Sequence, residues 1–312
     1  MTQPDPIRRA VPDAATLSTW TAPDGWPLRR FDWPNSRGRG RLMIQGGRGD
    51  PIEKHLETFG HFHRQGWSIT AFDWRGQGGS GRLSADPHVG HADDFTPWIA
   101  DLAALWRDWS AAGDGPRGII GHSMGGYLAL RAMVEGAIDP DAAVLVAPML
   151  GLRSPVGERL GARIAGWMVR YRDPATPAWR DGKQPVSLAT RRHLLTGDAS
   201  RYADEGWWHE RNPTIRLGPP SWGWLAEAFA ATRALVADPR LDTLPTPTLL
   251  LVAEADGLVD PRATIRVARR LPRGELIRFG RESAHEILRE ADPVRDRALA
   301  AIDTFLDVRA RP

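Results

Sequence analysis

Short runs of apolar residues alternate with longer amphipathic stretches through most of the chain. The runs typical of buried strands begin at Arg41, Trp67, Arg117, Ala142, Pro247 and Glu275. Between them, stretches such as 94–109 and 124–136 have apolar residues three and four positions apart, as amphipathic helices do. Because strand, helix and strand repeat in turn, the pattern predicts an α/β fold with a mostly parallel central sheet flanked by helices.

The beginning of the chain follows a different pattern. Two strand-like runs flank Asp24 and Gly25, a pair that favours a tight hairpin turn. We therefore expect an antiparallel hairpin ahead of the parallel strands. We also expect the first dozen residues to be frayed, because chain ends are poorly ordered unless other parts of the molecule hold them.

The alternation of strands and helices stops after Pro148. From there to about Thr243 the sequence has no convincing strand run, although it has several clusters of Pro, Gly and Trp. A segment of this length is too long for a plain loop. We predict that residues 148–243 form an inserted, mostly helical cap, and that residues 1–147 and 244–312 together form the core.

The composition narrows the range of functions. The 312 residues are 42% hydrophobic and 25% charged, which is typical of a globular protein. Lys and Arg number 41 against 38 Asp and Glu, so the net charge of +3 is too small and too mixed to indicate nucleic-acid binding. The chain has no cysteine, which excludes disulfides, thiolate metal ligands and cysteine nucleophiles.

The sequence also bears on where the protein acts. The N-terminal residues lack the apolar region of a signal peptide, and no run of about 18 apolar residues could span a bilayer. We expect a cytoplasmic protein. Basic residues of the predicted cap could meet anionic headgroups at a membrane surface, although a solvated helix face is the commoner explanation. These residues are Arg153, Arg159, Arg163, Arg170 and Arg172.

The strongest chemical signal is a G-x-S-x-G sequence running from Gly121 to Gly125, with Ser123 at its centre. It directly follows an apolar strand run and precedes a helical run, which is the context of a nucleophile elbow. Such a turn strains the serine backbone and leaves no room for side chains beside it, so glycine is needed at 121 and 125. We predict that Ser123 is a nucleophile and that His122 is held inside the elbow.

A serine nucleophile needs a base and an acid, and the fold places them later in the chain in the order Ser, Asp, His. Asp256 follows the strand run from Pro247, and His285 follows the run from Glu275. We predict His285 as the base and Asp256 as the acid. Glu254 and Asp260 are competing acids, but Glu254 lies in or at the end of the strand and Asp260 precedes Pro261 as a helix N-cap would.

The oxyanion of the tetrahedral intermediate needs backbone donors. One is the N–H of Met124, at the start of the helix that follows the nucleophile. The other comes from the loop after an earlier strand, where residues 45–49 read Gln-Gly-Gly-Arg-Gly. We predict Gly47 as this second donor, while noting that the two glycines and the arginine leave the register of the loop open.

Two other motifs have a structural explanation that we prefer. Residues 76–81 satisfy the G-x-G-x-x-G pattern of dinucleotide sites, but a polar, Pro-containing loop follows where a phosphate-binding helix would be required. A second group of residues contains histidines without the spacing of a known zinc site. This group comprises His61, His63, His88, His91, Asp93 and Asp94. We therefore predict no metal and no cofactor.

Tryptophan is abundant, and several of the 14 tryptophans lie in the predicted cap. Ordinary packing explains most of them. The more specific hypothesis is that some line an apolar acyl pocket and use their N–H groups on polar parts of a lipid-like substrate. The candidates for this pocket are Trp207, Trp208, Trp222 and Trp224.

Taken together, several segments are familiar: GHSMGG from Gly121, DWRGQGGSGR from Asp73, EADGLVD from Glu254 and AHEIL from Ala284. The chain resembles the lysophospholipase L2 and monoacylglycerol lipase-like branch of the α/β hydrolases, which is also similar to serine aminopeptidase S33 sequences. The resemblance runs from about Trp20 to the C-terminus. One departure is Gln45 and Gly46, where monoacylglycerol lipase-like sequences usually have His-Gly.

The resemblance implies a serine hydrolase that cleaves carboxylic esters through an acyl-enzyme, with a monoacyl lipid or similar small acyl ester as substrate. Acyl transfer to an alcohol and cleavage of an amide use the same three side chains and stay open as alternatives. A non-catalytic binding protein that retains the fold is a third alternative, disfavoured by the presence of all three residues.

Overall fold

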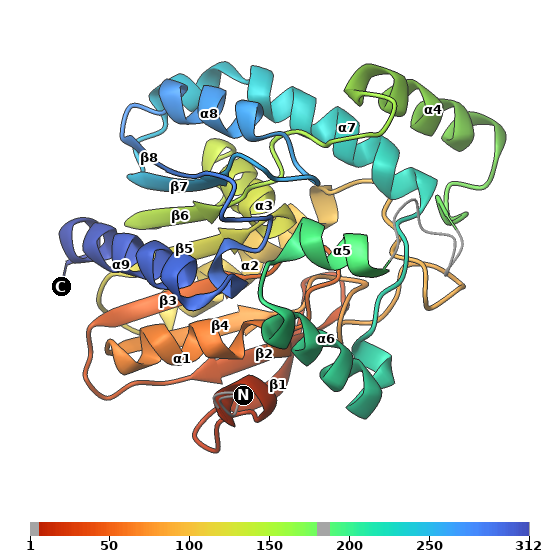
Figure 1. Cartoon of the computed structure of the whole chain (residues 1–312). Helices are drawn as coiled ribbons and strands as arrows, with labels where there is room; N and C mark the ends of the chain where they lie inside the picture. The colour runs from red at the N-terminus through yellow and green to blue at the C-terminus, as the bar shows by residue number, and fades with distance from the viewer. Residues whose placement is uncertain (1–5, 180–187, 312) are drawn as a thin grey trace.

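The structure, a computed structural model, describes residues 6–179 and 188–311. Its centre is an eight-stranded sheet in the order β1-β2-β4-β3-β5-β6-β7-β8 (Figure 1). From β3 to β8 every pairing is parallel, whereas β2 pairs antiparallel with both β1 and β4. The strands are β1 (Thr16–Thr21), β2 (Pro27–Trp33), β3 (Gly40–Gln45), β4 (Trp67–Phe72), β5 (Arg117–His122), β6 (Ala142–Val146), β7 (Thr248–Ala253) and β8 (Gly274–Phe279). The predicted mostly parallel sheet is confirmed.

The hairpin predicted at Asp24 and Gly25 is also confirmed. Its turn is closed by a hydrogen bond from the Gly25 N–H to the Ala22 carbonyl oxygen at 2.8 Å. Gly25 has a φ of 87°, a conformation that glycine adopts without a steric penalty.

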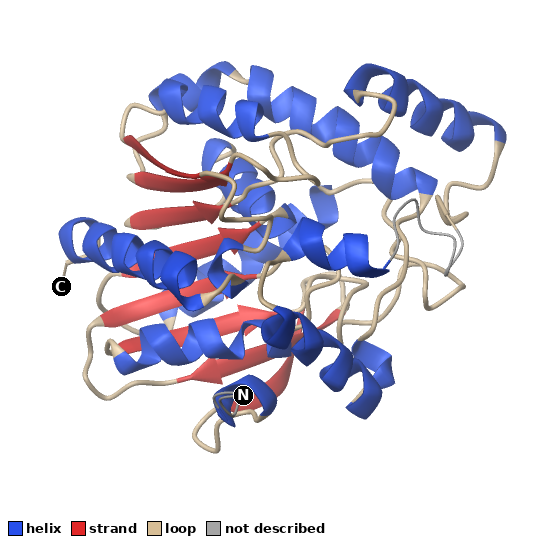
Figure 2. Cartoon of the chain, viewed as in Figure 1, coloured by secondary structure: helices blue, strands red, loops and turns tan. Residues whose placement is uncertain are grey.

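Helices cover both faces of the sheet (Figure 2). On one face α1 and α9 bury Phe59 and Ile302 against the strands. On the other face α2, α3 and α8 pack in a second apolar cluster that includes Leu102 and Leu128. These helices are α1 (Leu56–Arg64), α2 (Thr96–Ala111), α3 (Met124–Val134), α8 (Pro261–Arg270) and α9 (Asp292–Arg309). The central strands are buried on both faces, which is why β6 and β7 are continuous apolar runs rather than alternating ones.

Between β6 and β7 the described residues form helices, short 3-10 turns and loops, and none of them adds a strand to the sheet. Helix α7 lies along α4, and its buried residues, Trp224 and Leu235 among them, join the apolar cluster of the core. Helix α6 lies instead against the opposite end of the sheet (Figure 1), near the 3-10 helices η1 (Pro6–Arg9) and η2 (Ile52–His55). The elements are α4 (Glu158–Tyr171), α5 (Leu188–Leu195), α6 (Ala199–Arg211), η3 (Pro213–Ile215), α7 (Trp222–Ala237) and η4 (Pro239–Thr243).

The expectation of a frayed N-terminus is wrong for residues from Pro6 onward. Residues Pro6–Arg9 form the 3-10 helix η1, and Arg8 is buried. Its Nε donates to Asp204 Oδ2 on α6 at 2.6 Å, and its carbonyl oxygen accepts from Trp208 Nε1 at 3.0 Å. The segment is ordered because α6 supplies a buried carboxylate for it, a partner that a local reading of the sequence does not reveal.

Candidate active site

Ser123 lies at the turn between β5 and α3, as the motif predicts. Its φ of 52° and ψ of −117° are strained for a residue with a side chain. The turn is held closed by its neighbours: the Ser123 N–H donates to the Val146 carbonyl oxygen at 3.0 Å. A Cβ on Gly121 would lie 2.7 Å from the carbonyl oxygen of Gly125, so glycine is sterically required there.

The loops after β7 and β8 bring an acid and a base to this turn. His285 Nε2 lies 2.9 Å from Ser123 Oγ, and His285 Nδ1 lies 2.6 Å from Asp256 Oδ2. The other carboxylate oxygen of Asp256 accepts from the N–H groups of Leu258 at 2.8 Å and Val259 at 3.0 Å. With its proton on Nδ1, the imidazole donates to Asp256 and leaves Nε2 free to accept from the hydroxyl. We call Ser123, His285 and Asp256 the candidate triad.

The surroundings of Asp256 and His285 favour an ionised acid and a basic imidazole. Burial opposes the charge on Asp256, but His285 and the two N–H donors outweigh it and lower the pKa of the carboxyl. Burial also opposes the charge on His285, but the carboxylate of Asp256 outweighs it and raises the pKa of the imidazole. This is the electrostatic arrangement that a general base next to a serine needs.

The two competing acids have other partners. Glu254 binds Arg278 at the surface, with 2.5 Å between carboxylate oxygen and Nε. Asp260 is the N-cap of α8 and accepts from the Arg262 N–H at 3.0 Å. Of the three acids, Asp256 alone contacts His285 within the described part of the chain.

The two predicted oxyanion donors differ in their availability. The Met124 N–H begins α3 and has no hydrogen-bond partner among residues 6–179 and 188–311. Gly47 lies directly beside the nucleophile, since a Cβ on it would be 2.9 Å from Ser123 Cβ. Its N–H, however, donates to Asp50 Oδ2 at 2.8 Å. In this conformation an internal carboxylate takes the hydrogen bond that the prediction assigns to an oxyanion.

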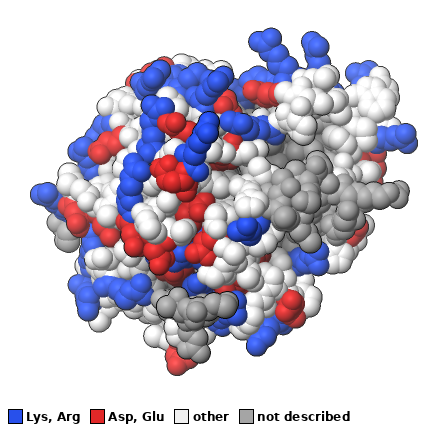
Figure 3. Space-filling model, in the orientation of Figure 1, with Lys and Arg blue, Asp and Glu red and all other residues white. Residues whose placement is uncertain are grey.

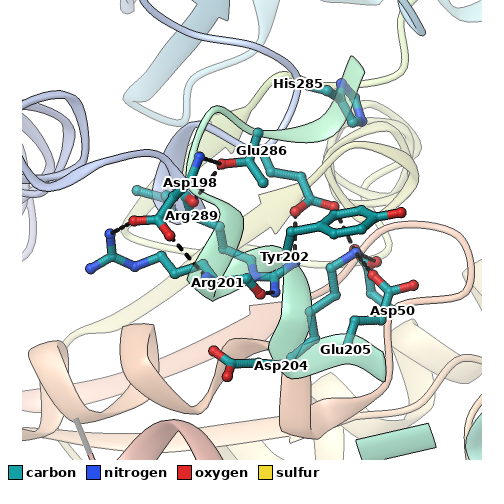
Figure 4. A network of polar contacts seen from close by, with 12 residues as sticks. Asp50, Asp198, Arg201, Tyr202, Asp204, Glu205, His285, Glu286 and Arg289 are labelled. Atoms are coloured by element: carbon teal, nitrogen blue, oxygen red, sulfur yellow. Dashed lines mark hydrogen bonds and ion pairs between the residues drawn. The ribbon is translucent and has the colours of Figure 1, made fainter. Parts of the chain in front are cut away.

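Asp50 belongs to a buried cluster of charges beside the candidate triad (Figure 4). At its centre Lys54 Nζ contacts three carboxylates: Asp50 at 2.5 Å, Glu286 at 2.7 Å and Glu205 at 3.1 Å. They come from the loop after β3, the residue next to His285 and helix α6, respectively. One ammonium group therefore joins two loops of the site to the segment between β6 and β7.

The charges in this cluster stabilise one another. Burial opposes ionisation of Asp50, Glu205 and Glu286, but Lys54 and the other neighbouring donors and cations together outweigh it and lower the pKa of each carboxyl, with Lys54 the largest of these favourable influences. Burial likewise opposes the charge on Lys54, and the carboxylates outweigh it and raise the pKa of the ammonium group. Arg289 adds a second cation, with its NH1 2.6 Å from Glu286 Oε2.

Sequence reasoning did not identify Lys54, Asp50 or Glu286. The signals in the sequence are the four-residue spacing of Asp50 and Lys54 and an acid directly after His285. Neither signal indicates that α6, about 150 positions later, brings Glu205 to the same ammonium group. His122, predicted to be held in the elbow, contacts this cluster: its Nδ1 lies 3.2 Å from Asp50 Oδ2.

Two of the four candidate pocket tryptophans lie at the start of α7. Trp224 is buried in the core, with its ring centroid 5.9 Å from that of Phe95. Trp222 is half-buried, and its backbone N–H donates to the Thr176 carbonyl oxygen at 3.0 Å.

The other two tryptophans lie on α6, next to the N-terminal segment. Trp208 donates to the Arg8 carbonyl oxygen, and Trp207 lies under the guanidinium of Arg211, 4.0 Å from its ring centroid. These contacts account for the positions of the two rings. Their role in a substrate pocket stays a prediction.

The glycine-rich segment 76–81 and the histidine groups make ordinary structural contacts. The glycines of 76–81 are followed by turns, and the next helix, α2, starts only at Thr96. His61 pairs with Asp303 at 2.9 Å, and His91 contacts Ser221 Oγ at 2.8 Å. Among residues 6–179 and 188–311, no group of three or more His, Cys, Asp or Glu residues is arranged to hold a metal ion. Nor does any helix in these ranges combine the length and apolar character needed to cross a bilayer.

Comparison with known proteins places this chain in a family. Residues 36–292 match the model of the family described as serine aminopeptidase, S33. Lysophospholipase L2 of Escherichia coli K12 is 33% identical over 245 residues, which cover 74% of this chain and 69% of the relative. A probable lysophospholipase L2 of Haemophilus influenzae is 28% identical over 295 residues, 90% of this chain and 88% of the relative.

Solved structures show the same fold. A soluble variant of monoglyceride lipase from Saccharomyces cerevisiae, in complex with a substrate analogue, superposes with a TM-score of 0.74 at 20% sequence identity. The superposition covers 97% of this chain and 98% of the lipase chain. The α/β-hydrolase fold predicted from the motifs is therefore confirmed. Both the family model and the lysophospholipase L2 relatives match most of the chain, which belongs to the serine aminopeptidase S33 family of α/β hydrolases.

Proposed function

We propose that this protein is a serine hydrolase that cleaves the carboxylic ester of a monoacyl lipid, or of a similar small acyl ester, through an acyl-enzyme. The observation that carries the proposal is the strained Ser123 hydrogen-bonded to His285, which is in turn bonded to a buried carboxylate. The kinship to lysophospholipase L2 and the fold shared with a monoglyceride lipase support a monoacyl lipid as the substrate.

In the first half of the reaction, His285 Nε2 takes the proton of Ser123 as Oγ attacks the ester carbonyl carbon. The carbonyl π pair moves to oxygen, and the tetrahedral oxyanion receives a hydrogen bond from the Met124 N–H. When the intermediate collapses, the bond to the alcohol oxygen breaks and His285 returns the proton to that oxygen. The products are a free alcohol and an acyl group esterified to Ser123.

In the second half, His285 takes a proton from water as the water oxygen attacks the acyl carbon. Collapse of this intermediate breaks the bond to Ser123 Oγ, which regains its proton, and releases the carboxylic acid. Throughout, Asp256 keeps Nδ1 protonated and stabilises the imidazolium. For Gly47 to be the second oxyanion donor, its N–H would have to exchange the Asp50 carboxylate for the oxyanion.

We include in the proposal that residues 148–243 act as a cap over the substrate. Support comes from the helices α4 to α7, which lie between β6 and β7, and from the contact of Glu205 on α6 with Lys54 beside the candidate triad. A cap in this position would shape the acyl pocket and set the preferred chain length.

We also propose that helix α4 rests on a lipid surface. Apolar side chains recur along one face at three- and four-residue spacing and are exposed, Trp167 by 55% and Tyr171 by 60%. Leu160 and Ile164 lie in the same row on α4, and Val156 is an exposed apolar residue just before the helix. Figure 3 shows basic side chains projecting around an uncharged area at the upper right, where α4 lies in Figure 1. An apolar face bordered by arginines suits an interface with anionic lipids.

Cosedimentation with phosphatidylglycerol vesicles tests the membrane contact. A several-fold smaller fraction of the double variant Leu160→Ser, Trp167→Ser should sediment with the vesicles. Leu17→Ser, which removes another exposed apolar side chain, on β1, should bind as wild type does. Equal binding by both variants would remove the membrane contact from the proposal without affecting the ester chemistry.

The catalytic proposal is tested with wild type and Ser123→Ala on p-nitrophenyl esters of graded chain length, lysophospholipid, monoacylglycerol and aminoacyl amides. We expect wild type to cleave the esters and to react with a fluorophosphonate probe, and Ser123→Ala to do neither while unfolding at the same temperature. Amide cleavage without ester cleavage would assign the other chemistry of the family. Ester hydrolysis retained in Ser123→Ala would refute the proposed nucleophile.

A further inference from the structure

Arg48 carries a charge that the chemistry described so far does not use. It follows Gly47, which lies against Ser123, so its backbone borders the reacting centre. Its guanidinium lies 5.3 Å from the ring centroid of Trp224, and NH2 donates to the Gly218 carbonyl oxygen at 2.8 Å. The side chain thus runs from the oxyanion loop to the loop before α7, and the residue keeps part of its surface exposed.

What sets Arg48 apart is the shortage of partners. In the described residues no carboxylate lies within 4.0 Å of its guanidinium, the enclosed Nε has no hydrogen-bond acceptor, and the group donates to the Gly218 carbonyl oxygen alone. Burial lowers the pKa of Arg48 to about 9; the nearby charge of Arg191 acts in the same direction and Asp50 opposes it. A cation held this way lacks the compensation that a buried charge normally has.

Other enclosed arginines of this protein are compensated. Arg75 binds both carboxylate oxygens of Asp101, at 2.8 and 2.6 Å, and Arg201 binds both of Glu57, each at 2.8 Å. Arg82 has no carboxylate partner among the residues that the structure describes, but its guanidinium donates to the carbonyl oxygens of five of them: Gly78, Gly81, Pro87, Thr214 and Arg216. Residues 6–179 and 188–311 give Arg48 neither kind of compensation, so an anion supplied by a ligand would complete its hydrogen bonding.

The position of Arg48 indicates which part of a substrate that anion belongs to. In a monoacyl glycerophospholipid, the glycerol backbone alone separates the scissile ester from the phosphate. With the ester carbonyl at Ser123, the phosphate lies a few bonds away, in the range of a long side chain that starts one residue after Gly47. A guanidinium matches phosphate oxygens in geometry and charge and can bind two of them at once.

We infer that Arg48 is a specificity-determining residue that binds the phosphate of a monoacyl glycerophospholipid and so favours it over a neutral monoacylglycerol. The inference rests on the proposed function and deepens it. The guanidinium lies over the Trp224 ring, and its hydrogen bond to the Gly218 carbonyl oxygen orients it. Binding of phosphate supplies the missing negative charge.

The test compares 1-acylglycerol 3-phosphate with 1-acylglycerol, both with the same short acyl chain and below their critical micelle concentrations, so that binding to lipid aggregates plays no part. In Arg48→Met, kcat/KM for the phosphate substrate should fall roughly tenfold to a hundredfold, the range for losing a charged hydrogen-bond partner. For the neutral substrate it should stay within about threefold. For Arg48→Lys, kcat/KM for the phosphate substrate should lie between the values for Arg48→Met and wild type. Arg82→Met, the matched control, should keep the wild-type ratio of kcat/KM for the two substrates.

Other outcomes separate the explanations. An equal fall for both substrates in Arg48→Met, with Arg48→Lys equally impaired, would mean that Arg48 only braces the two loops, and the inference would be wrong. An unchanged ratio of the two kcat/KM values in Arg48→Met would also overturn the inference. If the ratio is unchanged but inorganic phosphate inhibits wild type and not Arg48→Met, then Arg48 binds free phosphate and not the substrate headgroup, and the inference is again wrong. If wild type cleaves neither substrate, the proposed function itself fails.

Glycerol 3-phosphate supplies a readout that does not depend on turnover. Binding to Ser123→Ala, measured by calorimetry, should be lost in the double variant Ser123→Ala, Arg48→Met and retained in Ser123→Ala, Arg82→Met. Equal binding by the two double variants would contradict the inference.

Discussion

The backbone N–H of Gly47 donates a 2.8 Å hydrogen bond to Oδ2 of Asp50, whose other carboxylate oxygen lies 2.5 Å from Lys54 Nζ. One carboxylate thus joins the predicted oxyanion loop to the buried ammonium group. Asp50→Asn removes this charge and leaves Lys54 with fewer anions around it. We expect a loss of about 3 kcal/mol in the free energy of unfolding at neutral pH, as for other broken buried pairs.

The loss should depend on pH in a defined direction. Because the folded pKa of Asp50 lies well below its ordinary value, its stabilisation is present above the unfolded pKa of about 3.9 and declines as pH falls toward the folded value. Urea unfolding of wild type and Asp50→Asn should therefore converge below about pH 4. Asp13→Asn, at an exposed position, should match wild type throughout. A gap that widens in acid would contradict this account of Asp50.

Lys54 balances three buried carboxylates, so its removal should be more harmful than removal of any one of them. Lys54→Met keeps the apolar stem and deletes the charge, and we expect a loss of about 3–5 kcal/mol in stability. In a double-mutant cycle with Glu205→Gln, the combined loss should be smaller than the sum, because the second change removes one of the carboxylates stranded by the first. Strict additivity in urea unfolding would show that Lys54 and Glu205 are not coupled.

The raised pKa of His285 predicts the acid side of the pH–rate profile. The imidazole must be neutral to accept the serine proton, so kcat/KM should fall as pH drops through a pKa above the ordinary value of about 6.5. Asp256 is the main cause of the upward shift, and the charges of Glu286 and Asp50 act in the same direction. In Glu286→Gln the midpoint should therefore move to lower pH. A wild-type midpoint at or below about 6.5 would contradict the predicted shift.

Gly125 of the elbow should tolerate substitution far less than a helical glycine with open space around it, such as Gly206. A Cβ on Gly125 would overlap the carbonyl oxygen of Gly46 and approach that of Gln45 to 2.8 Å, and backbone atoms cannot move aside cheaply. Gly125→Ala should cost about 1–3 kcal/mol or more and disrupt the turn that holds Ser123. Gly206→Ala on α6 meets nothing within 4 Å and should stabilise the protein by up to about 1 kcal/mol. Thermal unfolding should therefore show a lower melting temperature for Gly125→Ala and an unchanged or higher one for Gly206→Ala.

Much of the architecture could be predicted because it depends on local patterns. The strands from Gly40 to Phe279 are short apolar runs between amphipathic helices, and their order along the chain implies a parallel sheet with its loops at one edge. The elbow motif and the positions of Asp256 and His285 after late strands are also readable, because parallel strands deliver their C-terminal ends to the same edge.

Other features depend on contacts between distant segments, and no local pattern encodes those. Glu205 and Arg8 have ordinary surface-type neighbours in the sequence, yet both are buried by the position of α6, one against Lys54 and the other against Asp204. The hydrogen bond from the Gly47 N–H to Asp50 likewise depends on the path of the loop after β3, and the sequence does not determine that path.

The sequence by itself thus determined the fold class, the order of the core elements and the residues of the candidate triad, since each is set by periodicity or by a short motif. Only the tertiary structure decided that Lys54 is surrounded by three carboxylates and that Arg48 has none beside it in the part of the chain that the structure describes. The physical reason is that a charge becomes costly or useful according to what is buried beside it, and burial is a property of the packed chain.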